Sequence, residues 1–192
     1  MNNFKNYHNY LLKESISGYF YRRLILYPFL RIIAGSEFLD VGCGIGIFLK
    51  YGSKKSLGLD VNPFNIDLIN KSKKERALLI KANGEFPVSS ESFKTVICDQ
   101  VLEHIEDPTT IIEEISRAVK KNGKIIIGLP MEKGFKSDSD HKKFYNIQSI
   151  KQKFANNYKV RYCFHFYFPI PFSFAGKYFS WQYIYIVFKS TK

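Results

Sequence analysis

Short apolar stretches recur between residues 37 and 129 of the chain, and each one ends in a polar turn or passes into a helical pattern. The helical patterns begin after Gly46 and lie near 64–75 and 108–121. The apolar stretches have the length of buried strands and lie near 37–42, 56–61, 77–81, 94–99 and 124–129. Alternation of this kind predicts an α/β fold with a mostly parallel sheet that helices cover on both faces.

The clearest helix is expected from Pro108 to Lys121. Asp107 is the expected N-cap, Pro108 suits the first helical position, and Gly123 suits the C-terminal stop. The strand that follows, Ile125–Ile127, is apolar throughout and is therefore expected to be fully buried.

The two ends of the chain carry different patterns. Residues 1–36 are rich in aromatic side chains and look helical, and we expect them to cap the sheet or cover a ligand. After a short helix following Asn146, aromatic residues alternate near 158–168 and again near 181–188, which is the period of a strand. These two segments are expected to form an antiparallel pair with a long connection.

Candidate chemistry begins where the first strand breaks into glycines. Gly42, Gly44 and Gly46 give the spacing G-x-G-x-G, whereas a dinucleotide fingerprint needs G-x-G-x-x-G and would place glycine at Ile47. Asp40 also precedes the first glycine by two residues, where its carboxylate would repel a pyrophosphate. The pattern therefore favours a nucleoside cofactor with a cationic arm over a nicotinamide dinucleotide, although a glycine turn of another α/β domain remains an alternative.

A second acid ends the second strand. Asp60 lies twenty residues after Asp40, and a carboxylate there has two acceptor oxygens for the two hydroxyls of a ribose. Val61 follows and offers an apolar contact for an adenine face. The alternative is that Asp60 only caps the helix that begins near Pro63.

These residues together resemble the class I S-adenosylmethionine-dependent methyltransferases, in the small-molecule, type 11-like branch, whose first motif reads D/E-x-G-x-G-x-G. The resemblance runs in motif order from about Phe38 to Pro130, with a weaker match around 141–145. It implies one Rossmann-like domain over 1–192, with a helical cap at 1–36 and a catalytic core at 37–192. The expected sheet is mostly parallel and seven-stranded, with helices on both faces and a C-terminal antiparallel strand pair.

The resemblance also implies a set of cofactor-binding residues. The methionine part of S-adenosyl-L-methionine would lie on the glycine turn, and the nucleoside would lie beyond the second and third strands. Asn83 is the candidate contact of the adenine amino group, because Ala82 stands where family members often carry an acid. The implied set is Asp40, Gly42, Cys43 (through its backbone), Gly44, Gly46, Asp60, Val61, Asn83, Asp99 and Gln100.

The segment Val101–His104 looks very similar to the V-L-E-H segment of small-molecule methyltransferases. The N/D-P-P-Y/F signature of enzymes that methylate amino groups of nucleic-acid bases is absent at this point. His104 and, in a D-H-x-x-x-F/Y-like segment, His141 are candidate proton acceptors, because a histidine titrates near neutral pH. Their alternatives are a cap of the loop for His104 and a hydrogen-bonded hinge for His141. No metal site is expected.

Composition changes this picture little. Lys and Arg exceed Asp and Glu by 29 to 17, a formal net charge of +12, but the lysines are scattered, as on a solvated basic surface. A nucleic-acid partner is therefore not expected. The 3 cysteines have no metal-ligand spacing and indicate a reducing compartment. With no leader peptide or membrane-spanning run in this sequence, a cytoplasmic location is expected.

Aromatic residues make up 17% of the chain, and many lie in the segments expected to cover the substrate. Packing in the core and in the last strands is expected to account for most of them, and an apolar or ringed acceptor is the functional alternative. The resemblance to the small-molecule branch implies a small-molecule acceptor, and oxygen of a metabolite, lipid precursor or surface-sugar intermediate is the expected methylated atom. The basic and aromatic segment 19–26 also suggests peripheral contact with a membrane surface. Two alternatives remain open, namely an RNA or protein methyltransferase and a non-catalytic regulatory protein that binds the cofactor. The sequence leaves the oligomeric state open.

Overall fold

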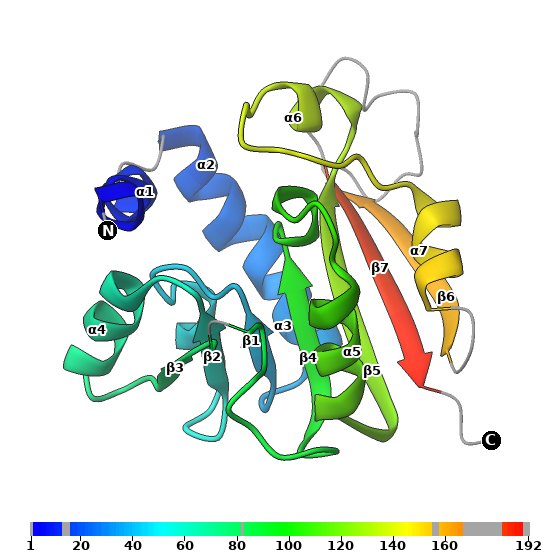
Figure 1. The fold of residues 1–192 in the computed structure, drawn as a ribbon, viewed down its shortest axis with the longest axis horizontal. Helices are drawn as coiled ribbons and strands as arrows, with labels where there is room; N and C mark the ends of the chain where they lie inside the picture. Colours follow the sequence, from blue (N-terminus) through cyan, green and yellow to red (C-terminus); the bar gives the residue numbers. More distant parts are fainter. Residues whose placement is uncertain (1, 13–15, 82, 155–157, 167–181, 190–192) are drawn as a thin grey trace. The chain divides into compact units, whose positions relative to one another are not determined.

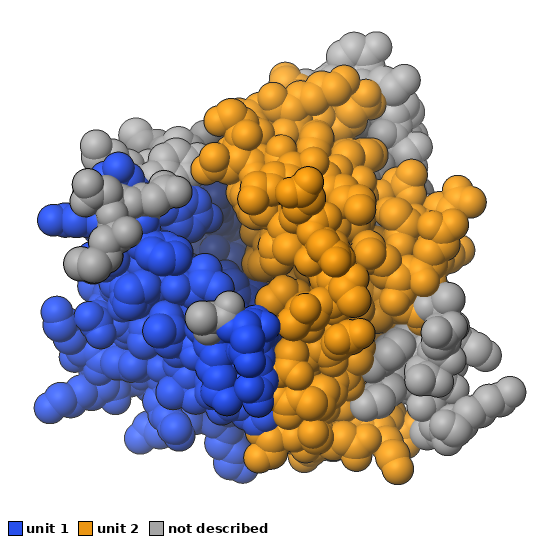
Figure 2. All heavy atoms as spheres, viewed as in Figure 1, with its two compact units in different colours: residues 1–88 blue, residues 89–192 orange. Residues whose placement is uncertain are grey.

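The computed structural model describes residues 2–12, 16–81, 83–154, 158–166 and 182–189. The chain divides into two compact units, residues 1–88 and residues 89–192, which Figure 2 colours separately. Each unit is described by itself below.

The first unit begins with helices, as the sequence predicts. They are α1 (Asn2–Leu12), α2 (Ile16–Tyr21), the π-helical turn η1 (Arg22–Leu26) and α3 (Tyr27–Ala34). In η1 the amide of Tyr27 donates to the carbonyl oxygen of Arg22, five residues earlier. Pro28 follows in the first turn of α3, where its missing N–H is not needed. The wide turn and the proline are thus adjacent, and the helical path continues through both.

Three parallel strands follow, in the order β3-β2-β1 (Figure 1). They are β1 (Leu39–Val41), β2 (Leu57–Asp60) and β3 (Ala77–Leu79), with the 3-10 turn η2 (Phe48–Tyr51) after the glycines and helix α4 (Pro63–Lys71) after β2. Leu39 lies opposite Leu57, and Asp40 lies opposite Gly58. Helix α4 packs on β2 and β3, and α1 packs on α4.

The core of the first unit is strongly aromatic. Phe38, Leu39 and Leu59 are fully buried. The ring of Phe48 stacks on that of Phe38 at 4.8 Å between centroids and lies 5.4 Å from that of Tyr27. Rings in this range contribute beyond the area that they bury, so the contact holds helix α3 against the strands.

The second unit contains four strands in the order β4-β5-β7-β6 (Figure 1). Its elements are β4 (Phe93–Asp99), η3 (Leu102–His104), α5 (Thr109–Ala118), β5 (Val119–Pro130), α6 (Glu132–Lys136), α7 (Ile147–Lys153), β6 (Tyr158–Phe166) and β7 (Gln182–Lys189). Strands β4 and β5 are parallel, whereas β7 is antiparallel to both β5 and β6. The expected C-terminal antiparallel pair is therefore confirmed; its connection lies outside the described residues.

The expected end of the helix after Pro108 is wrong. Helix α5 ends at Ala118, and Val119 already pairs with Phe93 of β4. The register then shifts before Lys124 pairs with Thr95, and the residue with positive φ in this bulge is Asn122 (61°). Gly123 is buried in the bulge. A Cβ at this position would lie 2.9 Å from the carbonyl oxygen of Lys94, so a larger side chain does not fit. Residues from Val119 onward, which helical periodicity alone assigns to the helix, are thus part of a strand.

The Rossmann-like α/β architecture is confirmed by these strand directions. The finer expectations, a single sheet of seven strands and a single domain over 1–192, stay predictions.

Substitution of Gly58 by alanine tests the packing under the glycine turn. An added Cβ would lie 2.6 Å from the sulfur of Cys43 and 2.7 Å from Cδ1 of Leu49, so one of these buried side chains must move. We expect Gly58→Ala to lower the free energy of unfolding by about 1 to 3 kcal/mol, measured by urea denaturation. Val61→Ala, at an exposed position just after the same strand, is the control and should change it by less than about 0.5 kcal/mol. Equal stabilities of the two variants would contradict the tight packing.

Candidate functional site

The glycine turn after β1 needs all three of its glycines. Gly42, Gly44 and Gly46 have φ values of 73°, 54° and 75°, in the left-handed region that side chains disfavour. The amides of Gly42 and Cys43 both donate to the carbonyl oxygen of Leu59, at 2.7 and 3.0 Å. The spacing read from the sequence therefore corresponds to a turn that is folded back against the end of β2.

Asp60 holds this turn from the side of β2. One carboxylate oxygen accepts from the amide of Gly44 at 2.8 Å, and the other accepts from the amide of Asn62 at 2.8 Å and from the side chain of Asn65 at 3.4 Å. Asp60 is 6% exposed, and burial raises its pKa while these N–H donors oppose the rise. The helix cap is Asn62, which accepts from the amide of Phe64, so the capping alternative for Asp60 is wrong.

Two further predicted residues are buried beside the turn. Asp40 is 5% exposed in the middle of β1. Burial raises the pKa of the Cys43 thiol well above its usual range, and the carboxylates of Asp40 and Asp60 add to the rise. The thiol therefore stays protonated, which agrees with an expected role for the backbone of Cys43 and not for its sulfur.

Helix α1 lies over the same region. His8 Nδ1 is 2.7 Å from the side-chain oxygen of Asn65, and Asn62 donates to the carbonyl oxygen of Phe4 at 2.8 Å. Asn62 and Asn65 are the residues that also bind Asp60, so α1 is linked to the glycine turn through them. Sequence reasoning did not assign these two asparagines; their place two and five residues after Asp60 is the signal that marks them.

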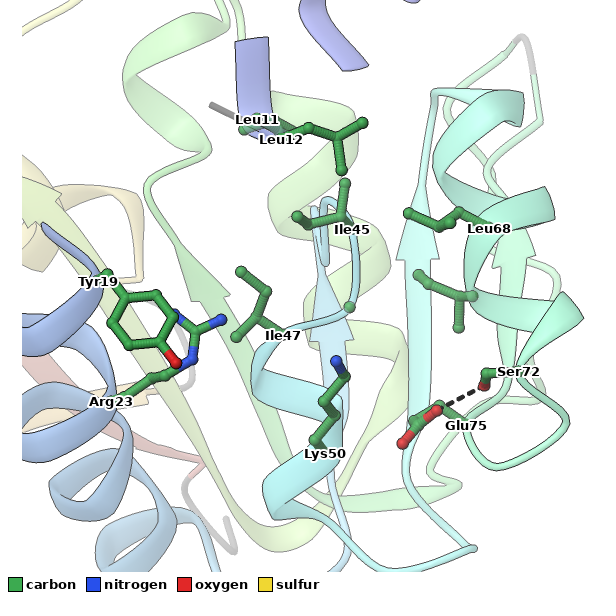
Figure 3. A pocket seen from close by; sticks show the side chains of 12 residues that line it. Leu11, Leu12, Tyr19, Arg23, Ile45, Ile47, Lys50, Leu68, Ser72 and Glu75 are labelled. Carbon is green, nitrogen blue, oxygen red and sulfur yellow. Dashed lines mark hydrogen bonds between the residues drawn. The ribbon is translucent and has the colours of Figure 1, made fainter. Parts of the chain in front are cut away.

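A pocket of about 480 Å³ lies next to the glycine turn (Figure 3). Side chains of α1, α2, η1 and α4 line it together with the turn: Leu11, Leu12, Tyr19, Arg23, Ile45, Gly46, Ile47, Lys50, Leu68, Ile69, Ser72 and Glu75. Arg23 lies over the ring of Tyr19, 3.7 Å from its centroid. Of the predicted cofactor residues this pocket contains Gly46, and neither Asp40 nor Asp60 lines it.

Val61 and Asn83, the two remaining predicted cofactor residues of the first unit, are both exposed and differ in their contacts. Val61 is 54% exposed just after the end of β2, where its side chain is free for an apolar ligand surface. Asn83 is exposed, and its side-chain oxygen accepts from the amide of Glu85 at 3.0 Å within its own turn. Its expected contact with adenine stays a prediction.

In the second unit, polar residues gather at the end of β4. Asp99 lies opposite Gly128 of β5, and its carboxylate occupies the space that a side chain at Gly128 would fill. The side chain of Gln182 donates to Asp99 at 3.2 Å. Gln100 turns the chain with a φ of 56°, and its amide donates to the carbonyl oxygen of Gly128 at 2.9 Å. Gln182 was missed by sequence reasoning because its strand pairing cannot be read from its neighbours.

The two candidate histidines lie together. The carbonyl oxygen of Glu103 accepts from the amides of Lys142 and Lys143 at 2.7 and 3.1 Å, which fixes the segment after β5 against η3. As a result the rings of His104 and His141 are 4.7 Å apart between centroids. Burial and the neighbouring His141 lower the pKa of His104, so its imidazole is neutral at neutral pH.

Glu103 is the unexpected member of this cluster. Its side chain is buried, and neither carboxylate oxygen has a hydrogen-bond partner among the described residues. One oxygen is 4.0 Å from Nε2 of His141. Burial, with smaller contributions from Asp99 and Asp138, raises the pKa of Glu103 to about 8. The V-L-E-H match contains Glu103, but sequence reasoning gave it no role.

The structure therefore forms two groups of predicted residues, one in each unit. The first joins the glycine turn to Asp60. In the second, Asp99 and Gln100 lie at the end of β4 and just after it, and the rings of His104 and His141 lie together. No helix of the described residues is long and apolar enough to cross a membrane.

Comparison with known proteins finds a methyltransferase domain in the middle of the chain. Residues 39–127 match the sequence model of a methyltransferase domain, from β1 into β5. An uncharacterised protein of Methanocaldococcus jannaschii is 34% identical over 117 residues, which are 60% of this chain and 53% of that protein. A ubiquinone biosynthesis O-methyltransferase of Thiobacillus denitrificans is 32% identical over 103 residues, 47% of this chain and 43% of the relative. The chain spans about half the length of these relatives or less.

Solved structures show the same fold. An S-adenosylmethionine-dependent methyltransferase from Archaeoglobus fulgidus aligns with a TM-score of 0.64 at 19% identity, covering 92% of this chain and 100% of that one. A geranyl diphosphate C-methyltransferase from Streptomyces coelicolor A3(2) aligns with a TM-score of 0.68 at 12% identity, covering 88% and 77%.

Fold and glycine turn thus define a Rossmann-like α/β protein. More specifically, residues 39–127 match a methyltransferase domain, and the solved structures with this fold include S-adenosylmethionine-dependent methyltransferases.

Proposed function

We propose that this protein transfers a methyl group from S-adenosylmethionine to an oxygen atom of a small molecule. The observation that carries the choice of oxygen is the His104–His141 pair, whose rings are 4.7 Å apart between centroids. A hydroxyl acceptor loses its proton as it is methylated, and a neutral imidazole is a suitable group to direct that proton. The similarity to ubiquinone biosynthesis O-methyltransferases supports the same choice.

The cofactor would be held by the first unit. Its methionine part is proposed to lie on the glycine turn, against the backbone of Gly42, Cys43 and Gly44. Asp60 is proposed to accept the ribose hydroxyls with its remaining lone pairs, since each of its oxygens already has a donor from the chain. Val61 and Asn83 would face the adenine, and Asp99 with Gln100 would border the sulfonium.

The reaction itself needs little from the protein beyond alignment. The carbon–sulfur bond of the sulfonium breaks as the oxygen–carbon bond forms, and the cofactor leaves as a neutral thioether. Because the cofactor supplies the activated methyl group, the chain must position the acceptor and direct its proton. The histidine pair is proposed for the second task.

Two alternatives make different demands. An RNA or protein substrate would use the formal net charge of +12, and its binding would fall steeply with salt. A regulatory protein without catalysis would bind the cofactor and transfer nothing. Lys94 and Ala82 stand where members of the resembled family often carry acids, and they keep that second alternative open.

Methyl transfer with a labelled methyl donor tests the proposal. We expect label in small hydroxyl or carboxyl compounds from a panel of phenols, lipid precursors and sugars, and none in RNA or protein. His104→Ala should lower the rate by about 10²- to 10⁴-fold at unchanged affinity for S-adenosylhomocysteine. Label only in macromolecules would support the RNA or protein alternative, and cofactor binding without any transfer would support the regulatory one.

Substitution of Asp60 tests the cofactor site separately. We expect Asp60→Asn to weaken binding of S-adenosylhomocysteine at least about tenfold in calorimetry, because a charged acceptor of the ribose and of the Gly44 amide is lost. Asp67→Asn, an exposed position on α4, is the matched control and should bind as the unchanged protein does. Equal affinity of both variants would remove Asp60 from the site.

Peripheral membrane contact is the remaining proposal from the sequence. Large apolar side chains are exposed on neighbouring helical turns, with Leu24 at 68% and Ile32 at 79%, and Arg22 lies in the same segment. We expect the protein to sediment with anionic liposomes and not with neutral ones. Leu24→Ser with Ile32→Ser should abolish sedimentation; sedimentation unchanged by this substitution would contradict the role of the segment.

A further inference from the structure

Glu103, His104 and His141 form a compact set of potential metal ligands in the second unit. One ligand atom from each residue can be chosen so that all of these atoms lie within 4.8 Å of one another. Two of the residues are consecutive in η3, and the third comes from the segment after α6. The amides of Lys142 and Lys143, which donate to the carbonyl oxygen of Glu103, keep the two segments together.

The carboxylate of Glu103 lacks a hydrogen-bond donor within the part of the chain that the structure describes. Its residue is 0% exposed, and both oxygens are buried without a hydrogen bond among the described residues. Burial of an ionised carboxylate without a partner costs roughly several kcal/mol of folding free energy, unless the carboxylate is neutralised. A cation beside it would supply both the missing charge and the missing contacts.

Each histidine is oriented by a backbone group. Nδ1 of His141 lies 2.9 Å from the carbonyl oxygen of Phe135, an acceptor only, so the neutral ring carries its proton on Nδ1 and leaves the Nε2 lone pair free. His104 is similarly hydrogen-bonded to the backbone of Asp140. Fixing one ring nitrogen by a second group is how proteins prepare the other nitrogen for a metal ion.

The surrounding charge is negative. Asp138 places a carboxylate oxygen 3.9 Å from Nε2 of His141, and Asp99 is near enough to Glu103 to affect its ionisation. Such a field favours a positive charge at the cluster, and therefore a bound cation.

We propose that Glu103, His104 and His141 bind a divalent transition-metal ion, with Zn²⁺ as the best match to the donor set. Two imidazoles and one carboxylate are a common ligand set of catalytic zinc, which leaves a fourth position open for an oxygen ligand. Imidazole donors select such ions over Mg²⁺ or Ca²⁺. Ligands about 2.1 Å from one tetrahedral ion lie about 3.4 Å apart, so the cluster must contract by about 1 Å on binding.

The role of this ion rests on the proposed function. A metal-bound acceptor hydroxyl loses its proton more easily than a free one, because the ion stabilises the oxyanion. The histidines would then act on the proton through the ion and not as direct acceptors. The binding site itself does not depend on this role.

Binding of Co²⁺, a spectroscopic substitute for Zn²⁺, is the test. Tag-free protein is treated with EDTA, dialysed, and titrated with Co²⁺ while visible absorption is recorded. We expect one Co²⁺ per chain with the intense bands of a four-coordinate site, displaced by one equivalent of Zn²⁺. His141→Ala and Glu103→Gln should each weaken binding at least tenfold. Glu103→Gln preserves the shape of the protonated carboxyl and should therefore fold.

The matched control is Glu106→Gln, which removes an exposed carboxylate three residues away and should bind Co²⁺ as the unchanged protein does. The proposal is overturned if Co²⁺ does not bind stoichiometrically, or if Glu103→Gln binds as tightly as Glu106→Gln. The assay also separates the site from the reaction. Stoichiometric Co²⁺ binding without methyl transfer to any small hydroxyl compound supports the site and contradicts the proposed function. Full transfer in EDTA overturns the role of the ion and leaves the proposed function standing.

Discussion

The first unit depends on a single buried carboxylate that accepts amide protons from two separate segments. Asp60 binds the amide of Gly44 in the glycine turn and that of Asn62 at the start of α4. A turn with three left-handed glycines has high conformational entropy in the unfolded chain, so it needs such an anchor to adopt one conformation. Because Asn62 and Asn65 also bind residues of α1, the same carboxylate indirectly positions the N-terminal helix.

Small residues opposite acids recur in both units. Gly58 lies opposite Asp40, and Gly128 lies opposite Asp99. In the second pair, the carboxylate uses the space left by the missing side chain, and in the first the space is filled by Cys43 and Leu49. The glycines in these strands are therefore part of the site architecture, although a glycine inside a strand generally weakens it.

The sequence predicts the strands and the glycine turn well because their signals are local. An apolar run, a glycine spacing and an acid at a strand end are each read from a few consecutive residues. The sequence-based prediction is wrong at the end of α5, because Val119 pairs with β4 and is not helical. Helical periodicity carries no information on strand pairing. The sequence also gives no role to Glu103, whose importance arises from burial and from amides almost forty residues further along the chain. Long-range contacts of this kind leave no pattern in one sequence.

Each unit contains a buried carboxyl group, Asp60 in the first and Glu103 in the second, and the two differ in their hydrogen-bond donors. Asp60 is surrounded by N–H donors that stabilise its ionised form, and these partly cancel the effect of burial on its pKa. Glu103 has its own backbone amide as the single opposing contribution, while Asp99 and Asp138 add to the effect of burial. Hydrogen bonds within the chain thus fix the first carboxylate as a structural acceptor. The second is also buried, and neither of its oxygens has a hydrogen-bond partner among the described residues, so a ligand from outside them, a proton or a metal ion, would complete it. Two ring nitrogens beside that carboxylate make the metal ion the better partner, because a proton would satisfy one oxygen and leave both imidazoles without a common ligand.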